Sequence, residues 1–157
     1  MTAMTSDVAQ SAARTALSLS PRMSRWVQTR VQEDTESDLS LRQLTTLQYI
    51  DSPETTLGDV ARNLMVTPAV VTGLIDRLER RGYVRRVASL FDRRRVHLEL
   101  TTAGEDARDH AENKLASELE RYIGELSGEE VDRLNDGLAL LNNVLSRLEQ
   151  ERKAPAR

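Results

Sequence analysis

The chain has 157 residues, 39% of them hydrophobic and 30% charged, which suits one compact unit, residues 1–157, rather than two independent domains. The absence of cysteine excludes disulfides, thiolate zinc sites and cysteine redox sensing, and two histidines are too few for a convincing metal site. No apolar run approaches the roughly 18 residues that span a bilayer, and no signal peptide is visible. We therefore expect a cytoplasmic protein with no membrane partner.

The two ends of the chain are predicted to be disordered, residues 1–14 because they are small and polar without periodicity and residues 152–157 as a frayed tail. Apolar residues then recur at helical spacing from Leu19 to Val31. Ser20 and Pro21 could begin this helix as its cap and first residue, or they could kink a helix that started near Asp7. The pattern leaves both alternatives open.

Two short helices are predicted next, each with a capping box at its start. Ser40 with Gln43 opens the first, which ends at Asp51-Ser52-Pro53. Thr56 with Asp59 opens the second, whose apolar face consists of Leu57, Val60, Ala61 and Leu64.

A third helix follows at once and has the layout of a DNA-recognition helix. Thr67 is its predicted cap, Pro68 its first residue, and Gly82 ends it. Its inner face is apolar: Val71, Leu74, Ile75 and Leu78. Its outer face carries small residues at the front, which permit close approach to a surface, and arginines behind them, which suit phosphates. The residues of this outer face are Ala69, Thr72, Gly73, Asp76, Arg77 and Arg80.

A β-hairpin is predicted after this helix. Polar and apolar residues alternate from Arg95 to Leu100, with Val96, Leu98 and Leu100 expected to point inward. Residues 83–88 would be the partner strand, and residues 89–94 the tip of a wing.

Two long amphipathic helices are predicted in the remainder of the chain. Thr102 with Glu105 would cap the first and Ser127 with Glu130 the second. In the second helix, leucines and Val131 step by three and four residues as in a heptad seam: Val131, Leu134, Leu138, Leu141, Leu145 and Leu148. This apolar surface exceeds what a small domain needs, so it indicates either packing within the chain or a dimer interface.

Charge is distributed unevenly along the chain. Residues 76–95 contain eight arginines and three acids, a net charge of +5, whereas residues 102–151 contain five bases and thirteen acids, a net charge of −8. A basic patch on an acidic body favours nucleic-acid binding in a fixed orientation. The alternative is a solvated charge run in an arginine-rich chain, which does not explain the clustering beside a recognition-type helix.

The segment from residue 71 to residue 104 resembles the winged helix of the MarR (multiple antibiotic resistance regulator) family. The matching motifs occur in order and at the family's spacing: Val71-Thr72, Asp76-Arg77-Leu78-Glu79, Gly82-Tyr83-Val84, Asp92-Arg93-Arg94 and Leu98-x-Leu100-Thr101-x-x-Gly104. A weaker resemblance extends over roughly residues 15–148.

The resemblance implies a mainly α fold with a small β-wing, in which residues 39–101 form a winged helix-turn-helix and residues 15–33 and 104–150 form N- and C-terminal dimerisation helices. It implies a homodimer that regulates transcription, most often as a repressor, on pseudo-palindromic double-stranded DNA. In the wing, Arg94 would enter the minor groove with help from Asp92, while Arg93 and Arg95 meet phosphates. The candidate DNA-binding residues are Thr67, Pro68, Ala69, Val70, Thr72, Gly73, Arg77, Arg80, Asp92, Arg93, Arg94 and Arg95.

Gly73 departs from the family, whose members often carry a larger residue there. It either permits close approach to DNA or marks a missing base contact. A small organic effector, anionic or aromatic, is expected if the protein has one. Trp26, Arg30 and Tyr49 are candidate ligand-binding residues, although Trp26 and Tyr49 fit an ordinary core better and Arg30 could equally face solvent.

No catalytic motif, cofactor or metal site is predicted, so we expect no enzyme. The alternative function is a winged-helix module for protein–protein interaction.

Overall fold

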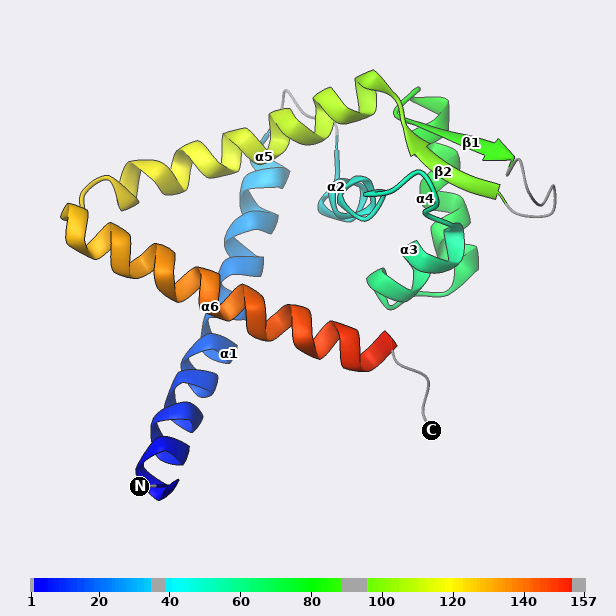
Figure 1. Ribbon diagram of the computed structural model, residues 1–157. Helices are drawn as coiled ribbons and strands as arrows, with labels where there is room; N and C mark the ends of the chain where they lie inside the picture. The colour runs from blue at the N-terminus through cyan, green and yellow to red at the C-terminus, as the bar shows by residue number, and fades with distance from the viewer. Residues whose placement is uncertain (1, 35–38, 89–95, 154–157) are drawn as a thin grey trace. The chain divides into compact units, whose positions relative to one another are not determined.

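The computed structural model describes residues 2–34, 39–88 and 96–153. These residues form six helices and one two-stranded sheet, in the order α1 (Thr2–Glu33), α2 (Leu41–Gln48), α3 (Leu57–Leu64), α4 (Pro68–Arg80), β1 (Val84–Ala88), β2 (Val96–Leu100), α5 (Thr102–Ile123) and α6 (Gly128–Lys153) (Figure 1). The predicted fold class, mainly helical with a small wing, is confirmed. No described helix combines the length and the apolar character that a membrane crossing requires.

Helix α1 differs from its prediction at its start. It begins at Thr2 and continues through Pro21, so residues 2–14, expected to be disordered, belong to the helix. The physical reason is helix propensity: this segment has four alanines and neither glycine nor proline, although it lacks an apolar stripe. At the other end of the chain, α6 extends to Lys153, two residues into the expected tail.

The starts of the five helices after α1 were predicted to within one residue. Ser40 with Gln43 and Thr56 with Asp59 form complete capping boxes. In contrast, Thr102 is already inside α5, and Thr101 caps the helix instead: its Oγ1 accepts the Gly104 N–H at 3.1 Å. The threonine pair 101–102 made the position of the cap ambiguous by one residue.

The chain divides into two compact units, residues 1–115 and 116–157. The first unit has its main core between α2, α3, α4 and the sheet, built from aliphatic side chains such as Leu47, Val60, Ile75, Leu78 and Leu98. A smaller cluster joins α1, α2 and the first half of α5 through Val31, Leu44 and Ala111. The second unit contains the end of α5, a turn and α6.

The sheet is antiparallel, with Val84 opposite Leu100 and Arg86 opposite Leu98. Leu98 is fully buried, but Val96, predicted to point inward, is 38% exposed, so only the base of the hairpin packs on the core. The Leu98 N–H donates to the Thr55 carbonyl at 2.8 Å and thereby ties β2 to the loop before α3.

Candidate nucleic-acid interface

Helix α4 is held by its inner face and leaves its outer face open to solvent. Val71, Ile75 and Leu78 are fully buried in the main core, and Leu74 is nearly so. Pro68 occupies the first turn, where its missing N–H costs no hydrogen bond. Gly82 has a φ of +73°, a conformation that glycine adopts without strain, and it turns the chain from α4 into β1. This arrangement fixes the direction of α4 relative to the sheet.

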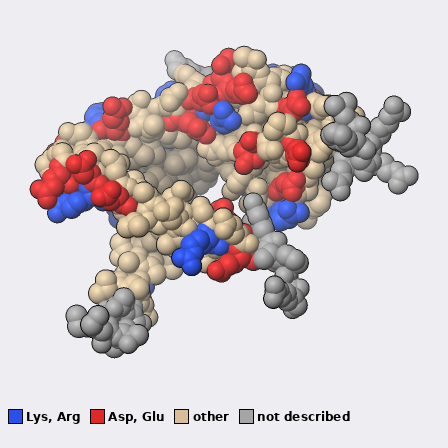
Figure 2. All heavy atoms as spheres, viewed as in Figure 1, with Lys and Arg blue, Asp and Glu red and all other residues tan. Residues whose placement is uncertain are grey.

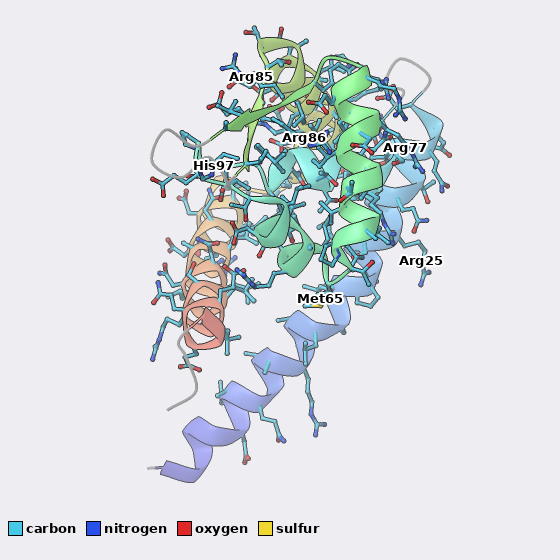
Figure 3. The ribbon with its side chains drawn as sticks, turned by 90° about the vertical axis from the view of Figure 1, so that its right-hand side faces the viewer. Arg25, Met65, Arg77, Arg85, Arg86 and His97 are labelled. Carbon is cyan, nitrogen blue, oxygen red and sulfur yellow. The ribbon has the colours of Figure 1, made fainter. Side chains whose placement is uncertain are left out.

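The turn between α3 and α4 also has a left-handed residue, Met65, with a φ of 54°. Its side chain is 81% exposed and lies at the N-terminal end of α4 (Figure 3). The sequence places Met65 in the turn between the two helices but does not indicate its left-handed backbone, because a glycine is the usual signal for that conformation. The exposed apolar side chain therefore lies beside the predicted recognition surface.

The front of α4 presents the small residues that were predicted to approach DNA. Thr67, Pro68, Ala69, Val70 and Thr72 are all exposed. The Thr72 hydroxyl donates to the Pro68 carbonyl at 2.9 Å, which leaves its oxygen free to accept from a base edge. Thr67 is the N-cap residue as predicted, but its side chain makes no capping hydrogen bond.

Gly73 lies within α4 in open surroundings. A Cβ placed on this residue would meet no atom of the described residues within 4 Å, and its φ is not in the left-handed region. Neither packing nor backbone conformation within the chain therefore requires glycine here, even though glycine inside a helix costs about 1 kcal/mol relative to alanine.

The eight arginines counted in the basic patch fall into distinct groups. Arg93, Arg94 and Arg95, together with Asp92, lie outside the described residues. Arg77 and Arg80 are exposed on α4 and make no salt bridge to any residue within the described ranges; Arg77 projects sideways from the helix (Figure 3). Arg81 lies over the Tyr83 ring, with Cζ 4.9 Å from the ring centroid.

The two remaining arginines of the patch, Arg85 and Arg86, are neighbours on β1 and take part in different ion pairs. Arg85 pairs within the sheet with Glu99, its Nη2 lying 2.6 Å from Oε2. Arg86 reaches α4, where Nη2 lies 2.6 Å from Asp76 Oδ1 and Nη1 contacts Glu79 Oε2. Burial lowers the pKa of Arg86, but the hydrogen bond to Asp76 and the charge of Glu79 outweigh it, so the pKa is raised above its ordinary value.

The three candidate ligand-binding residues are not brought together. Trp26 and Arg30 line a shallow hollow of about 460 Å³ along α1, whose described lining residues are Arg22, Arg25, Trp26, Thr29, Arg30 and Glu33. Tyr49 packs against the main core and is absent from that lining. Arg30 is also engaged by Glu33, with Nη1 2.7 Å from Oε2.

A larger hollow of about 760 Å³ lies between the end of α1 and the start of α2, with Gln28, Gln32 and Arg42 among its lining residues. Sequence reasoning missed it, because none of these residues carries a distinctive motif.

Acidic side chains gather around the turn between α5 and α6 in the second unit (Figure 2). Ser127 and Glu130 form the predicted capping box at the start of α6. The Ser127 N–H and hydroxyl both donate to the Glu130 carboxylate and lower its pKa. Leucines of the predicted heptad seam in α6 are exposed, with Leu138 at 53% and Leu148 at 57%.

Comparisons with known proteins agree with this architecture. Residues 39–96 match the MarR family. The chain is 31% identical over 122 residues to YfiV of Bacillus subtilis (strain 168), an HTH-type transcriptional regulator, and the match covers 77% of this chain and 76% of the relative.

Two solved structures extend the likeness over most of the fold. FabT of Streptococcus pneumoniae, solved in complex with DNA, is 30% identical, with a TM-score of 0.66 and coverage of 88% of this chain and 98% of FabT. The transcriptional regulator Tm0710 of Thermotoga maritima is 25% identical, with a TM-score of 0.66 and coverage of 87% and 98%. These relatives are regulators rather than enzymes, as expected from the sequence. The chain therefore belongs to the MarR family of transcriptional regulators.

Proposed function

We propose that the protein is a repressor that binds a pseudo-palindromic DNA duplex as a homodimer. The observation that carries this proposal is α4: its inner face is anchored in the core, while its outer face presents exposed small residues followed by Arg77 and Arg80. A helix presented in this way fits the major groove, with its front at the base edges and its arginines at phosphates. The complex of FabT with DNA supports the same assignment.

Each chemical group on this face has a suitable partner in a duplex. The exposed Val70 could contact a thymine methyl group, and the Thr72 oxygen could accept from the amino group of adenine or cytosine. Thr67, Pro68, Ala69 and Gly73 provide room for the backbone to approach. From the resemblance, Asp92 and Arg94 would place the wing in the minor groove, with Arg93 and Arg95 at phosphates.

The homodimer is supported by apolar surface that the chain leaves uncovered. Four leucines of the α6 seam are exposed, namely Leu134, Leu138, Leu145 and Leu148, while Val131 and Leu141 are half-buried. In water such a seam is stabilised by burial against another helix. We assign residues 15–33 and 104–150 to the dimer contact and residues 39–101 to DNA binding, within one functional domain. Two recognition helices about one helical turn apart, roughly 34–36 Å, would then match successive major grooves.

The test is a gel shift with the duplex upstream of the chain's own gene, carried out at two salt concentrations, with light scattering for the oligomeric state. We expect a dimer whose affinity for the duplex falls steeply with salt. Absence of binding at low salt would refute the DNA-binding proposal and favour the protein-interaction alternative. A monomer at micromolar concentration would refute the dimer.

Control by a small organic effector is the remaining part of the proposal. Such a ligand can release DNA only if it binds more tightly to a dimer whose recognition helices are wrongly spaced. We place the hinges near residues 34–40 and 101–105, where the dimerisation helices meet the winged helix; residues 35–38 of the first segment lie outside the described residues. The hollow between α1 and α2 lies beside the first of them.

Trp26, the only tryptophan, is half-buried on α1 and offers a fluorescence probe. A panel of phenolic and carboxylic acids is expected to contain one compound that changes Trp26 fluorescence and releases DNA at similar concentrations. Compounds that alter fluorescence but leave DNA affinity unchanged would refute regulation through this site.

A further inference from the structure

Arg86 connects the wing strand β1 to the recognition helix α4 (Figure 3). Its guanidinium binds both carboxylates of the outer face of α4, Asp76 at 2.6 Å and Glu79, and its backbone N–H also donates to Glu79 Oε1 at 3.4 Å. The Arg86 side chain is 27% exposed, so it is covered more than either carboxylate, at 43% and 40%. One arginine of the strand thus engages both acidic residues of the helix.

The two carboxylates lie among the arginines proposed to meet phosphates. Asp76 precedes Arg77 and is four residues before Arg80, a spacing at which an acid and an arginine pair readily along a helix. Glu79 directly precedes Arg80. Even so, neither Arg77 nor Arg80 forms a salt bridge with another described residue. The carboxylates are engaged by Arg86 instead.

We infer that Arg86 is a positioning residue for DNA binding: it holds Asp76 and Glu79 so that Arg77 and Arg80 stay available to phosphates. The inference rests on the proposed DNA-binding function and deepens it. Without Arg86, Asp76 would pair with Arg80, and both carboxylates would repel the DNA backbone. Sequence reasoning counted Arg86 as part of the attractive patch, whereas its charge is used within the protein.

Arg85 provides a matched control on the same strand. It is 66% exposed and pairs with Glu99 of β2, away from α4. Arg85→Gln and Arg86→Gln each remove one positive charge, from adjacent positions on β1. The difference between them is that only Arg86→Gln releases the carboxylates of α4.

The experiment measures fluorescence anisotropy with the upstream duplex and a random duplex at two salt concentrations. Arg86→Gln is expected to weaken binding to both by at least about tenfold and to make the salt slope shallower by about one unit, because Arg80 is withdrawn. Arg85→Gln should weaken binding by less than about fivefold, since exposed ion pairs contribute little. Wild-type affinity in Arg86→Gln would overturn the inference.

Rescue distinguishes release of the carboxylates from simple loss of a structural contact. The triple variant Arg86→Gln/Asp76→Asn/Glu79→Gln lacks both the arginine and the charges it holds, so its affinity should return to within about fivefold of wild type. Persistent weakening in a folded triple variant would overturn the inference.

The double variant Asp76→Asn/Glu79→Gln keeps Arg86 and tests the same point if Arg86→Gln does not fold. It should bind at least as tightly as wild type at low salt. Weaker binding would indicate that the contact between α4 and β1 matters in itself and would overturn the inference. If the wild-type chain bound no duplex, the proposed DNA-binding function would be refuted. That result comes from the wild-type chain alone and is therefore distinct from any result obtained with these variants.

Discussion

Replacement of Gly73 by alanine separates the stability of α4 from its proposed contact with DNA. A Cβ at this position meets no atom within 4 Å in the part of the chain that the structure describes, so the substitution adds no clash there. Alanine is favoured over glycine inside a helix by about 1 kcal/mol. For a chain of this size, that gain corresponds to a rise in Tm of about 2–4 °C. We therefore expect Gly73→Ala to be more stable than wild type.

The same variant should bind its operator less well if the helix backbone approaches the bases at this position. A methyl group in a close contact would weaken specific binding by about 1–3 kcal/mol and leave binding to random DNA unchanged. The assay combines thermal unfolding with anisotropy titrations on the operator and on a random duplex. Thermal unfolding is measured at a fixed protein concentration, because the stability of a dimer depends on concentration. A stabilised variant with wild-type operator affinity would refute close approach and favour a missing base contact.

Gly104→Ala should destabilise the protein, because a Cβ there would lie 2.0 Å from the Tyr83 carbonyl oxygen. We expect the free energy of unfolding to fall by about 1–3 kcal/mol. An unchanged midpoint of urea unfolding would contradict the close contact between Gly104 and Tyr83. Asp59→Ala removes the capping box of α3 and should cost about 1 kcal/mol at pH 7. The hydrogen bond from Thr56 lowers the pKa of Asp59 below 3.8, so this contribution is complete above the unfolded pKa and disappears as the pH falls through the folded pKa. Unfolding curves of wild type and Asp59→Ala should therefore converge in acid, and a constant difference would be evidence against the pKa shift. Arg94→Ala should weaken operator binding by about 1–3 kcal/mol and relax the preference for A/T flanks, whereas Arg80→Ala should weaken all duplexes and lower the salt slope by about one unit. Equal losses on all sequences for both arginine variants would rule out a minor-groove role for Arg94.

The winged helix-turn-helix was predictable because its local signals agree with one another. Thr56 and Asp59 mark a helix start, Pro68 marks the next, and Gly82 marks an end, while apolar spacing identifies the inner face of α4. Each signal depends on residues close in sequence. Their agreement over a short segment leaves few alternative folds.

Other features could not be predicted, because they depend on contacts between different elements or occur in segments without apolar periodicity. The ion pairs of Arg86 join residues seven and ten positions apart on different elements, so a charge count could not distinguish them from a free basic patch. The first turns of α1 have helix-forming residues but no apolar stripe, and periodicity alone missed them. Trp26 and Tyr49 are both half-buried aromatic residues, and only the fold shows that Tyr49 packs against the main core whereas Trp26 lines the hollow along α1.

The hydrogen bond from the Leu98 N–H to the Thr55 carbonyl has a consequence for how this region unfolds. It links the inner end of the wing to the loop before α3, and the Leu98 side chain is itself fully buried. The base of the hairpin can therefore open only when the helix-turn-helix core opens with it. In amide hydrogen exchange, Leu98 should be among the slowest residues and should exchange at the rate of global unfolding. Val96, exposed two residues earlier on the same strand, should exchange through local fraying.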